Sequence, residues 1–268
     1  MLNRFNFLTP AWRQRRLLWD LIRRDVAGRY RGSAMGLLWS LITPMLMLAI
    51  YTFVFSVVFR ARWGGGAEDR VTFAINLFAG MIVHGLVAEC INRAPSLVLS
   101  NVNYVKRVRF PLELLCWVSL GTALFHAVIS LVVLSIFLVL SQGYLSATIL
   151  WLPLVWLPLL LGTLGVSWIL ASLGVFLRDI GQMTGTVTTM LLFLSPIFYP
   201  ATALPEPYRT VLYLNPLTFV IEQTRAVLIA GQAPDWPAQM VALAVGALVA
   251  ALGFAWFEKS RRGFADVL

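Results

Sequence analysis

The stretch FLSPIFYPATALPEPYRTVLYLNPLTF, residues 193–219, combines an apolar composition with residues that interrupt helices. Proline has no amide hydrogen to donate and clashes with the preceding turn, so it ends or kinks an α-helix. The stretch contains five prolines: Pro196, Pro200, Pro205, Pro207 and Pro216. It therefore predicts short helices in an apolar environment and excludes one helix that crosses a membrane.

The composition of the whole chain places that environment in a lipid bilayer. Hydrophobic residues make up 59% of the 268 residues, charged residues make up 12%, and the mean hydropathy is +0.81. Soluble domains have about 25% charged residues. Six apolar stretches approach the roughly 20 residues that a helix needs to cross a bilayer. These stretches cover approximately residues 36–59, 71–91, 112–140, 149–177, 182–200 and 237–257.

The fold class follows from these stretches. Backbone groups in lipid must pair internally, and the stretches lack the alternation of barrel strands, so helices are expected. The sequence also has no repeat and no linker long enough to separate soluble domains. We therefore predict an all-α integral membrane protein with six transmembrane helices in a single membrane domain, residues 1–268.

The distribution of basic residues predicts the orientation of these helices. Of the 21 Lys and Arg residues, 16 lie in residues 1–36, residues 92–111, Arg178 and the tail after residue 257. Basic residues accumulate on the cytoplasmic side of membrane proteins, so both termini are expected in the cytoplasm. The net charge of +9 is then explained by topology and contact with anionic lipid, and we expect no nucleic-acid partner.

Residues 12–31 predict an amphipathic helix on the cytoplasmic membrane surface. Apolar residues form one stripe of the helical wheel, and arginines fill the adjacent face. The stripe consists of Trp12, Trp19, Ile22, Val26 and Tyr30. Such a helix is either an interfacial anchor in anionic lipid or a docking surface for a cytoplasmic partner.

A second cytoplasmic feature, residues 97–109, separates the second and third predicted spans. A short helix is expected across residues 97–105, and Pro111 suits the first turn of the next span. The basic residues Lys106, Arg107 and Arg109 follow this helix. The segment could simply join two helices, or it could contact a partner.

Motifs for catalysis and metal binding are absent from the sequence. The two histidines, His84 and His126, lie in separate spans and lack a dense ligand set, and neither lysine belongs to a phosphate-binding GxxxxGK[ST] loop. We therefore predict no catalytic residue, no metal site and no cofactor on this chain. Intramembrane charge is sparse, which argues against ion-coupled transport, and we interpret Glu89 and Arg93 as a structural i, i+4 pair.

Five ordered motifs resemble one family over nearly the whole chain. They are RYRGSAMGLLWSLITPMLMLAIYTFVF (29–55), NYVKRVRFPLELL (103–115), LGVFLRDIGQ (173–182), SPIFYP (195–200) and LYLNPLTFVIE (212–222). In this order they resemble the membrane permease of type-two ABC exporters for O-antigen, capsule and teichoic-acid polymers. The sequence departs from that pattern at Leu112 and Glu113, where a basic or polar residue is expected, and in the WGGG segment within residues 61–70.

The resemblance implies a homodimer that binds two copies of a separate ABC ATPase subunit, which would hold ATP and Mg. It also implies that residues 12–31 lie against that ATPase and that residues 97–109 act as a coupling helix. The implied ATPase interface consists of Arg29, Tyr30, Arg31, Tyr104, Lys106, Arg107, Arg109, Arg178 and Asp179.

The resemblance also explains the proline-rich stretch. The family folds two short re-entrant helices into the outer half of the membrane after the fifth span, and this implies an external gate across residues 205–231. Broken backbone is tolerated at membrane depth where protein buries it. The implied gate residues are Pro205, Tyr208, Arg209, Asn215 and Pro216. The alternative is an ordinary external loop.

A polymer channel needs flat apolar surfaces with few strong contacts, and aromatic rings supply them. The first and fifth spans line the path in the family, which implies a substrate channel of Tyr51, Phe55, Phe59, Phe198 and Tyr199. From spacing alone, a stripe such as Tyr51, Phe55 and Phe59 is more often helix packing than a channel lining, and only the resemblance makes the two readings equal.

The predicted function is that of a permease subunit that exports lipid-linked polysaccharide, with O-antigen first and capsule next, on an undecaprenyl-type carrier. The alternatives are a permease for teichoic acid and one for drugs or lipids. An enzyme embedded in the membrane would need a cluster of acids, histidines or metal ligands that the sequence lacks.

Overall fold

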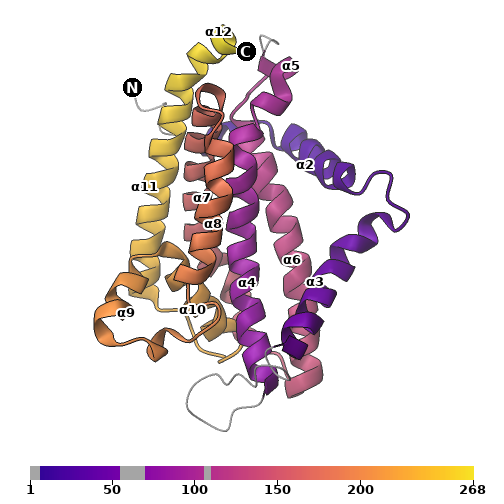
Figure 1. Cartoon of the computed structure of the whole chain (residues 1–268), viewed down its shortest axis with the longest axis vertical. Coiled ribbons are helices and arrows are strands. Elements are labelled where there is room, and N and C mark those ends of the chain that lie inside the picture. The colour runs from indigo at the N-terminus through magenta and orange to yellow at the C-terminus, as the bar shows by residue number, and fades with distance from the viewer. Residues whose placement is uncertain (1–6, 55–69, 106–109) are drawn as a thin grey trace.

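The computed structural model describes residues 7–54, 70–105 and 110–268, and these residues form helices joined by turns, without a strand (Figure 1). The all-α prediction is confirmed. The helices are α1 Leu8–Arg13, α2 Arg15–Arg29, α3 Trp39–Tyr51, α4 Arg70–Arg93, α5 Val102–Val105, α6 Leu114–Gln142, α7 Leu152–Phe176, α8 Ile180–Leu194, α9 Glu206–Tyr213, α10 Pro216–Leu228, α11 Trp236–Ser260 and α12 Phe264–Val267.

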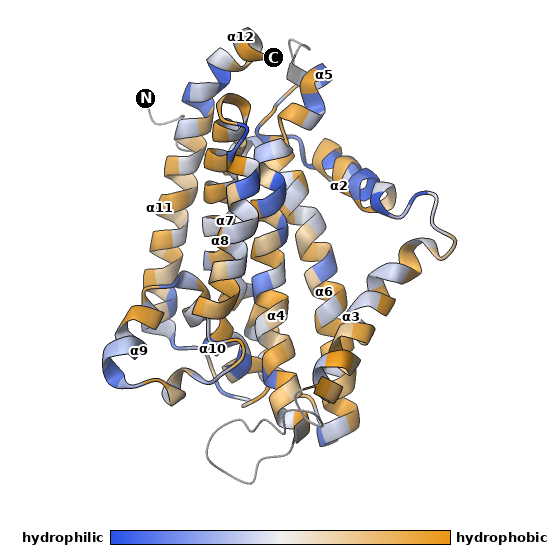
Figure 2. Ribbon diagram, viewed as in Figure 1, coloured by the Kyte–Doolittle hydropathy of each residue, from blue (hydrophilic) through white to orange (hydrophobic). Residues whose placement is uncertain are grey.

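Within the described residues, five helical segments are long and apolar enough to cross a membrane. They are Gly36–Val54, Val71–Ser96, Leu114–Gln142, Ala147–Phe176 and Trp236–Gly263. Each overlaps one of the predicted spans, and the chain is a multi-pass membrane protein. Figure 2 shows apolar residues along these helices and hydrophilic residues gathered on α2 and near α12.

The fifth predicted span, residues 182–200, corresponds to the shorter apolar helix α8. At about 1.5 Å per residue, its 15 residues extend less far than the roughly 30 Å of a hydrocarbon core. The helix ends at Leu194 because Pro196 follows and Ser195 adopts an extended conformation. The count of six spans therefore stays a prediction.

The tightest helix pair consists of α7 and α11. A β-carbon on Gly253 would collide with the carbonyl oxygen of Gly165, and one on Gly246 would collide with that of Pro158. Small residues allow two helix backbones to approach closely. In a bilayer the hydrophobic effect does not drive helices together, so the van der Waals contacts of this close approach stabilise the pair. This pair forms one wall of the bundle.

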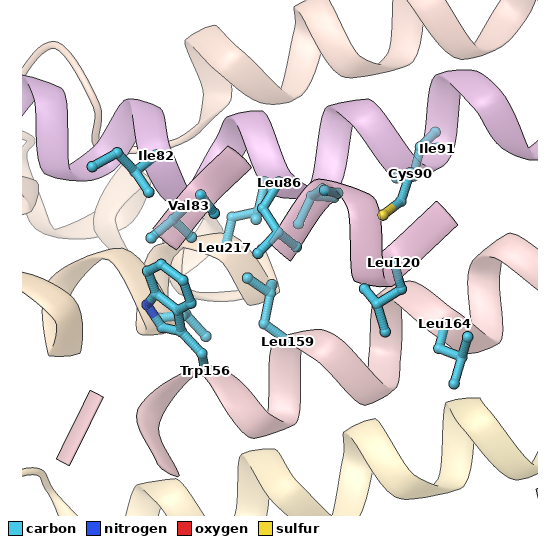
Figure 3. Close-up of a cluster of buried hydrophobic side chains, with 14 of the residues drawn as sticks. Ile82, Val83, Leu86, Cys90, Ile91, Leu120, Trp156, Leu159, Leu164 and Leu217 are labelled. Atoms are coloured by element: carbon cyan, nitrogen blue, oxygen red, sulfur yellow. The ribbon is translucent and has the colours of Figure 1, made fainter. Parts of the chain in front are cut away.

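The apolar core lies between α4, α6, α7 and α10. Figure 3 shows side chains of α4, including Val83 and Leu86, pointing toward Trp156 and Leu159 of α7. Trp156 also donates a hydrogen bond from Nε1 to Thr224 Oγ1 of α10 at 3.0 Å, so the indole is both packed and satisfied.

Two groups of short elements occupy opposite ends of the bundle. Figure 1 places α2, α5 and α12 toward one end, and α9 and α10 toward the other. At the first end, Glu113 precedes α6 and accepts a hydrogen bond from Arg261 at 3.0 Å. Arg261 also donates to the carbonyl of Phe110 at 3.1 Å. The C-terminal helices are therefore fixed to the start of α6.

Candidate transport site and partner surface

The predicted amphipathic segment, residues 12–31, covers the end of α1 and the whole of α2, with a break at Gln14. Ile22 packs over Gly121 of α6, and Val26 is buried. Trp12 and Trp19 are 74% and 66% exposed. The predicted apolar stripe is thus divided between a part that packs on the bundle and an aromatic part that faces outward.

Polar side chains attach α2 to α4. Arg93 donates two hydrogen bonds to the Asp25 carboxylate, from Nη1 to Oδ2 and from Nη2 to Oδ1, both at 2.9 Å. Arg29 forms a salt bridge with Glu89 at 2.5 Å. The bidentate, charge-assisted contact between Arg93 and Asp25 fixes orientation as well as distance. We call these two ion pairs the α2 clamp.

The clamp continues into α6. Thr122 donates to Asp25 at 2.8 Å, and His126 Nδ1 lies 3.0 Å from Glu89 Oε2. Tyr30 OH lies 3.1 Å from the other ring nitrogen of His126. The polar contacts between α2, α4 and α6 therefore form two clusters, one centred on Asp25 and one centred on Glu89.

The prediction that Glu89 and Arg93 pair with each other is wrong. Each of the two residues binds a residue of α2, because α2 crosses α4 at the level where both side chains project. Asp25 and Arg29 are also an acid and a base four residues apart, like Glu89 and Arg93. The matching spacing lets the two helices exchange partners.

The clamp holds Asp25 in its charged form. Partial burial raises the pKa of the Asp25 carboxyl, but hydrogen bonds from Arg93 and Thr122 outweigh burial, and the net pKa lies below the usual value. The carboxylate is therefore ionised at neutral pH.

The predicted coupling region begins with a 3₁₀ turn, Leu99–Asn101, and continues as α5. Of the short helix expected across residues 97–105, residues 99–105 are helical and residues 97–98 form a turn. Tyr104 stacks on Phe110 with ring centroids 4.2 Å apart. Tyr104 also lines a cavity of about 420 Å³ that faces Arg24 and Asp25 of α2. Lys106, Arg107 and Arg109 lie outside the described residues.

Some of the other predicted interface residues are exposed, and some are paired within the chain. Arg31, Arg178 and Asp179 are exposed, the last two in the turn between α7 and α8. Arg29 and Tyr30 instead bind Glu89 and His126 within the chain. The assignment of these residues to an ATPase interface stays a prediction.

The predicted channel residues belong to separate clusters. Tyr51, the last residue of α3, lines a cavity of about 320 Å³ with Trp39, Phe78 and His126. Phe198 stacks on Phe193, with ring centroids 5.6 Å apart. Tyr199 OH donates to the Phe193 carbonyl at 3.2 Å. Phe55 and Phe59 lie outside the described residues, and the channel assignment stays a prediction.

The predicted gate region contains α9 and α10. Pro205 precedes α9, and Pro216 is the first residue of α10. Asn215 accepts from the Leu217 amide at 3.0 Å and donates to Ser195 Oγ at 2.9 Å, so it caps α10 and ties α10 to the end of α8. The short helices agree with the prediction, and their re-entrance into the membrane stays a prediction.

Two further predicted gate residues lie on α9. Tyr208 is 66% exposed, and Arg209 donates to the carbonyls of Thr202 and Leu204 at 3.2 and 3.1 Å. The turn before α9 is therefore fastened by Arg209, and the tyrosine ring is available for an external contact.

Arg225 of α10 is the main residue that the sequence interpretation missed. It is 6% exposed and donates from Nε and Nη2 to the Asn76 carbonyl of α4 at 3.1 and 3.0 Å. It also donates to the Ile197 carbonyl at 3.3 Å and to Glu222 at 3.0 Å. One buried guanidinium thus joins α10, α4 and the SPIFYP segment.

Comparison with known proteins assigns the family. A family model described as ABC-2 type transporter matches residues 16–229, from the start of α2 to the end of α10. The chain belongs to the ABC-2 type transporter family.

Relatives of this ABC-2 transporter chain are similar over most of their length. The O-antigen export system permease protein RfbA of Myxococcus xanthus is 28% identical over 260 residues, which cover 95% of this chain and 96% of that protein. The polysialic acid transport protein KpsM of Escherichia coli is 22% identical over 79% of this chain and 80% of its own. The capsule polysaccharide export inner-membrane protein CtrC of Neisseria meningitidis serogroup B is 21% identical to this chain. The alignment covers 80% of this chain and 79% of CtrC.

Two kinds of residue in this ABC-2 chain were missed for different reasons. Asp25 carried a usable signal, since its spacing to Arg29 matches that of Glu89 to Arg93. Arg225 carried none, because an arginine beside a glutamate in a short helix is usually exposed.

Proposed function

We propose that this ABC-2 permease is the membrane subunit of an ATP-driven exporter that moves lipid-linked polysaccharide, O-antigen first and capsule next, out of the cytoplasm. The alignment with RfbA of Myxococcus xanthus carries the proposal, because it runs end to end over 95% of this chain. The alignments with KpsM and CtrC, which cover about four fifths of the chain, support capsule as the second candidate.

The proposed assembly is a homodimer with two copies of an ABC ATPase, which binds ATP and Mg. Its cytoplasmic docking surface consists of α2, α5 and the turn with Arg178 and Asp179, and both termini lie on that side. The gathering of α2, α5 and α12 at one end supports this orientation. The helices α9 and α10 at the opposite end are the proposed external gate.

The proposed path runs along α3 and α8. These helices expose large apolar side chains, including Met45 and Phe53 on the α3 span and Met190 on α8. Exposed apolar faces of membrane helices contact lipid or a second protomer, and a dimer would enclose the faces that line the path. Phe198 and Tyr199 would offer ring faces to the sugars.

Depletion of this chain in its host tests the function. Lipid-linked polysaccharide is expected to accumulate inside the cell while surface polymer disappears, and reintroduction of the wild-type chain is expected to reverse both changes. The measurement is the amount of glycan in each fraction. Normal amounts in both fractions would overturn the polysaccharide assignment and favour a drug or lipid substrate.

The double substitution Phe198→Ala/Tyr199→Ala tests the path. Export of polymer is expected to fall by about 30-fold, because two stacking surfaces, each worth on the order of 1 kcal/mol, are lost. Initial rates of surface appearance at matched permease levels measure the effect. Tyr144→Ala, an exposed tyrosine after α6, is the control. Equal rates for both variants would remove these residues from the path.

A further inference from the structure

The α2 clamp attaches α2 at two points to the same end of α4. Asp25 and Arg29 lie four residues apart on α2, and their partners Arg93 and Glu89 lie four residues apart on α4. All four side chains are between 19% and 32% exposed. Two partly buried ion pairs in series resist both rotation and sliding of one helix against the other.

Contacts to α6 extend this unit to a third helix. Thr122 donates to Asp25, His126 contacts Glu89, and Ile22 packs over Gly121. Polar and apolar contacts at one level therefore hold α2, α4 and α6 together.

The clamp also joins two regions that are proposed to dock on the ATPase. Arg93 is the last residue of α4, and the coupling region with α5 follows directly. Through Asp25, α2 is bound to the base of that region. When either α2 or the coupling region is displaced, the clamp therefore transmits the displacement to the other.

The helix α3, unlike α2, α4 and α6, is packed loosely against the rest of the chain. Only 11% of its apolar span is buried, against 72% for the span of α4. A cavity of about 320 Å³ separates part of α3 from α4 and α6, and one of about 740 Å³ lies between α3 and α6 farther along. Within the part of the chain that the structure describes, few contacts hold α3 in one position on this bundle.

The connection between α2 and α3 contains two residues with left-handed backbone. Gly32 has a φ of 87° and Gly36 a φ of 51°, and among the described residues nothing fills the space where their side chains would lie. Glycine adopts these angles without steric cost, so the connection can change its direction easily.

We propose that α2, α4 and α6 move as one rigid unit when the ATPase works, and that α3 swings against this unit about residues 32–36. The inference rests on the proposed function, since it requires the ATPase. Asp25 and Arg29 are positioning residues: they bind no substrate, and they determine which helix receives the displacement.

Spin-label distances in the complex with the ATPase test the division into rigid and moving parts. One label pair, Arg23→Cys with Ser96→Cys, reports α2 against the end of α4. The other pair, Met45→Cys with Leu140→Cys, reports α3 against α6. Labelled protomers are diluted with unlabelled ones, so that distances within one protomer dominate.

The first distance is expected to stay constant between the nucleotide-free and the ATP-trapped complex, and the second is expected to shift. A shift of the first distance, or a constant second distance in a complex that hydrolyses ATP, would overturn the inference. A chain that fails to co-purify with an ABC ATPase would instead contradict the proposed function.

Charge reversal tests the positioning role. Asp25→Arg and Arg93→Asp each place like charges together, and each is expected to lower polymer exported per ATP hydrolysed by more than about tenfold while the ATPase still binds. The double variant Asp25→Arg/Arg93→Asp restores an opposite pair and is expected to recover part of that ratio. Asp20→Arg on the exposed face of α2 reports the effect of the charge change alone.

A purely structural role would lower the amount of complex and leave the ratio of export to hydrolysis unchanged, and that result would overturn the inference. Where a single variant fails to fold, the distance measurements on the wild-type contacts decide the question.

Discussion

Replacement of Arg225 by leucine is expected to destabilise the permease by about 3–5 kcal/mol, because several hydrogen bonds from one buried charged group are lost together. The Asn76 and Ile197 carbonyls lose their donor, and Glu222 loses its cation. The helix α10 is expected to detach first, since these contacts fix it to α4. Thermal unfolding of purified protein in one detergent measures the loss.

Two further variants separate charge from geometry at this position. Arg225→Lys keeps the charge but cannot reach the same acceptors with a planar group, so an intermediate loss is expected. Arg209→Leu is the control, because Arg209 also donates to two carbonyls but is less buried. Equal midpoints for Arg225→Leu and Arg209→Leu would show that the Arg225 contacts do not hold α10 on α4.

Substitution of Gly253 by alanine is expected to separate α7 from α11, with a loss of about 1–3 kcal/mol that is typical of overpacking. The new methyl group would collide with the carbonyl of Gly165, which is backbone and cannot move aside without displacing α7. Leucine at the same position is expected to prevent accumulation of folded protein. Size-exclusion profiles and unfolding midpoints report both outcomes.

Gly162→Ala is the matched control on α7. Among the described residues, no neighbouring atom lies within 4 Å of the position that the new methyl group would take. Alanine is also a better helix former than glycine by up to about 1 kcal/mol. The midpoint of this variant is expected to stay equal or to rise. A loss at Gly162 as large as that at Gly253 would mean that helix contact is not the cause.

Much of the fold could be predicted because membrane helices follow simple rules of length and polarity. The spans that contain α4, α6, α7 and α11 were predicted to within a few residues at most ends. The end of α8 was less predictable, since the residues after Leu194 are still apolar and only Pro196 marks the stop.

The site was less predictable because its contacts join distant parts of the chain. Glu89 had a plausible partner four residues away in Arg93, and only the crossing of α2 decides that Arg29 binds it instead. The channel has a different difficulty. In the proposed dimer, the path would be lined by faces that one chain leaves exposed, so sequence and single-chain geometry both give only candidates such as Tyr51 and Tyr199.

The contact between Arg225 and Asn76 joins residues 149 positions apart, and this separation sets an order for biogenesis. An arginine is costly in hydrocarbon until it finds its acceptors. During synthesis, α4 is inserted long before α10 leaves the ribosome, so the acceptor carbonyl is in place before its donor arrives. The contact that fixes α10 to α4 is therefore made late in synthesis, and a chain stalled before α10 lacks both this contact and the later helix α11, which packs on α7.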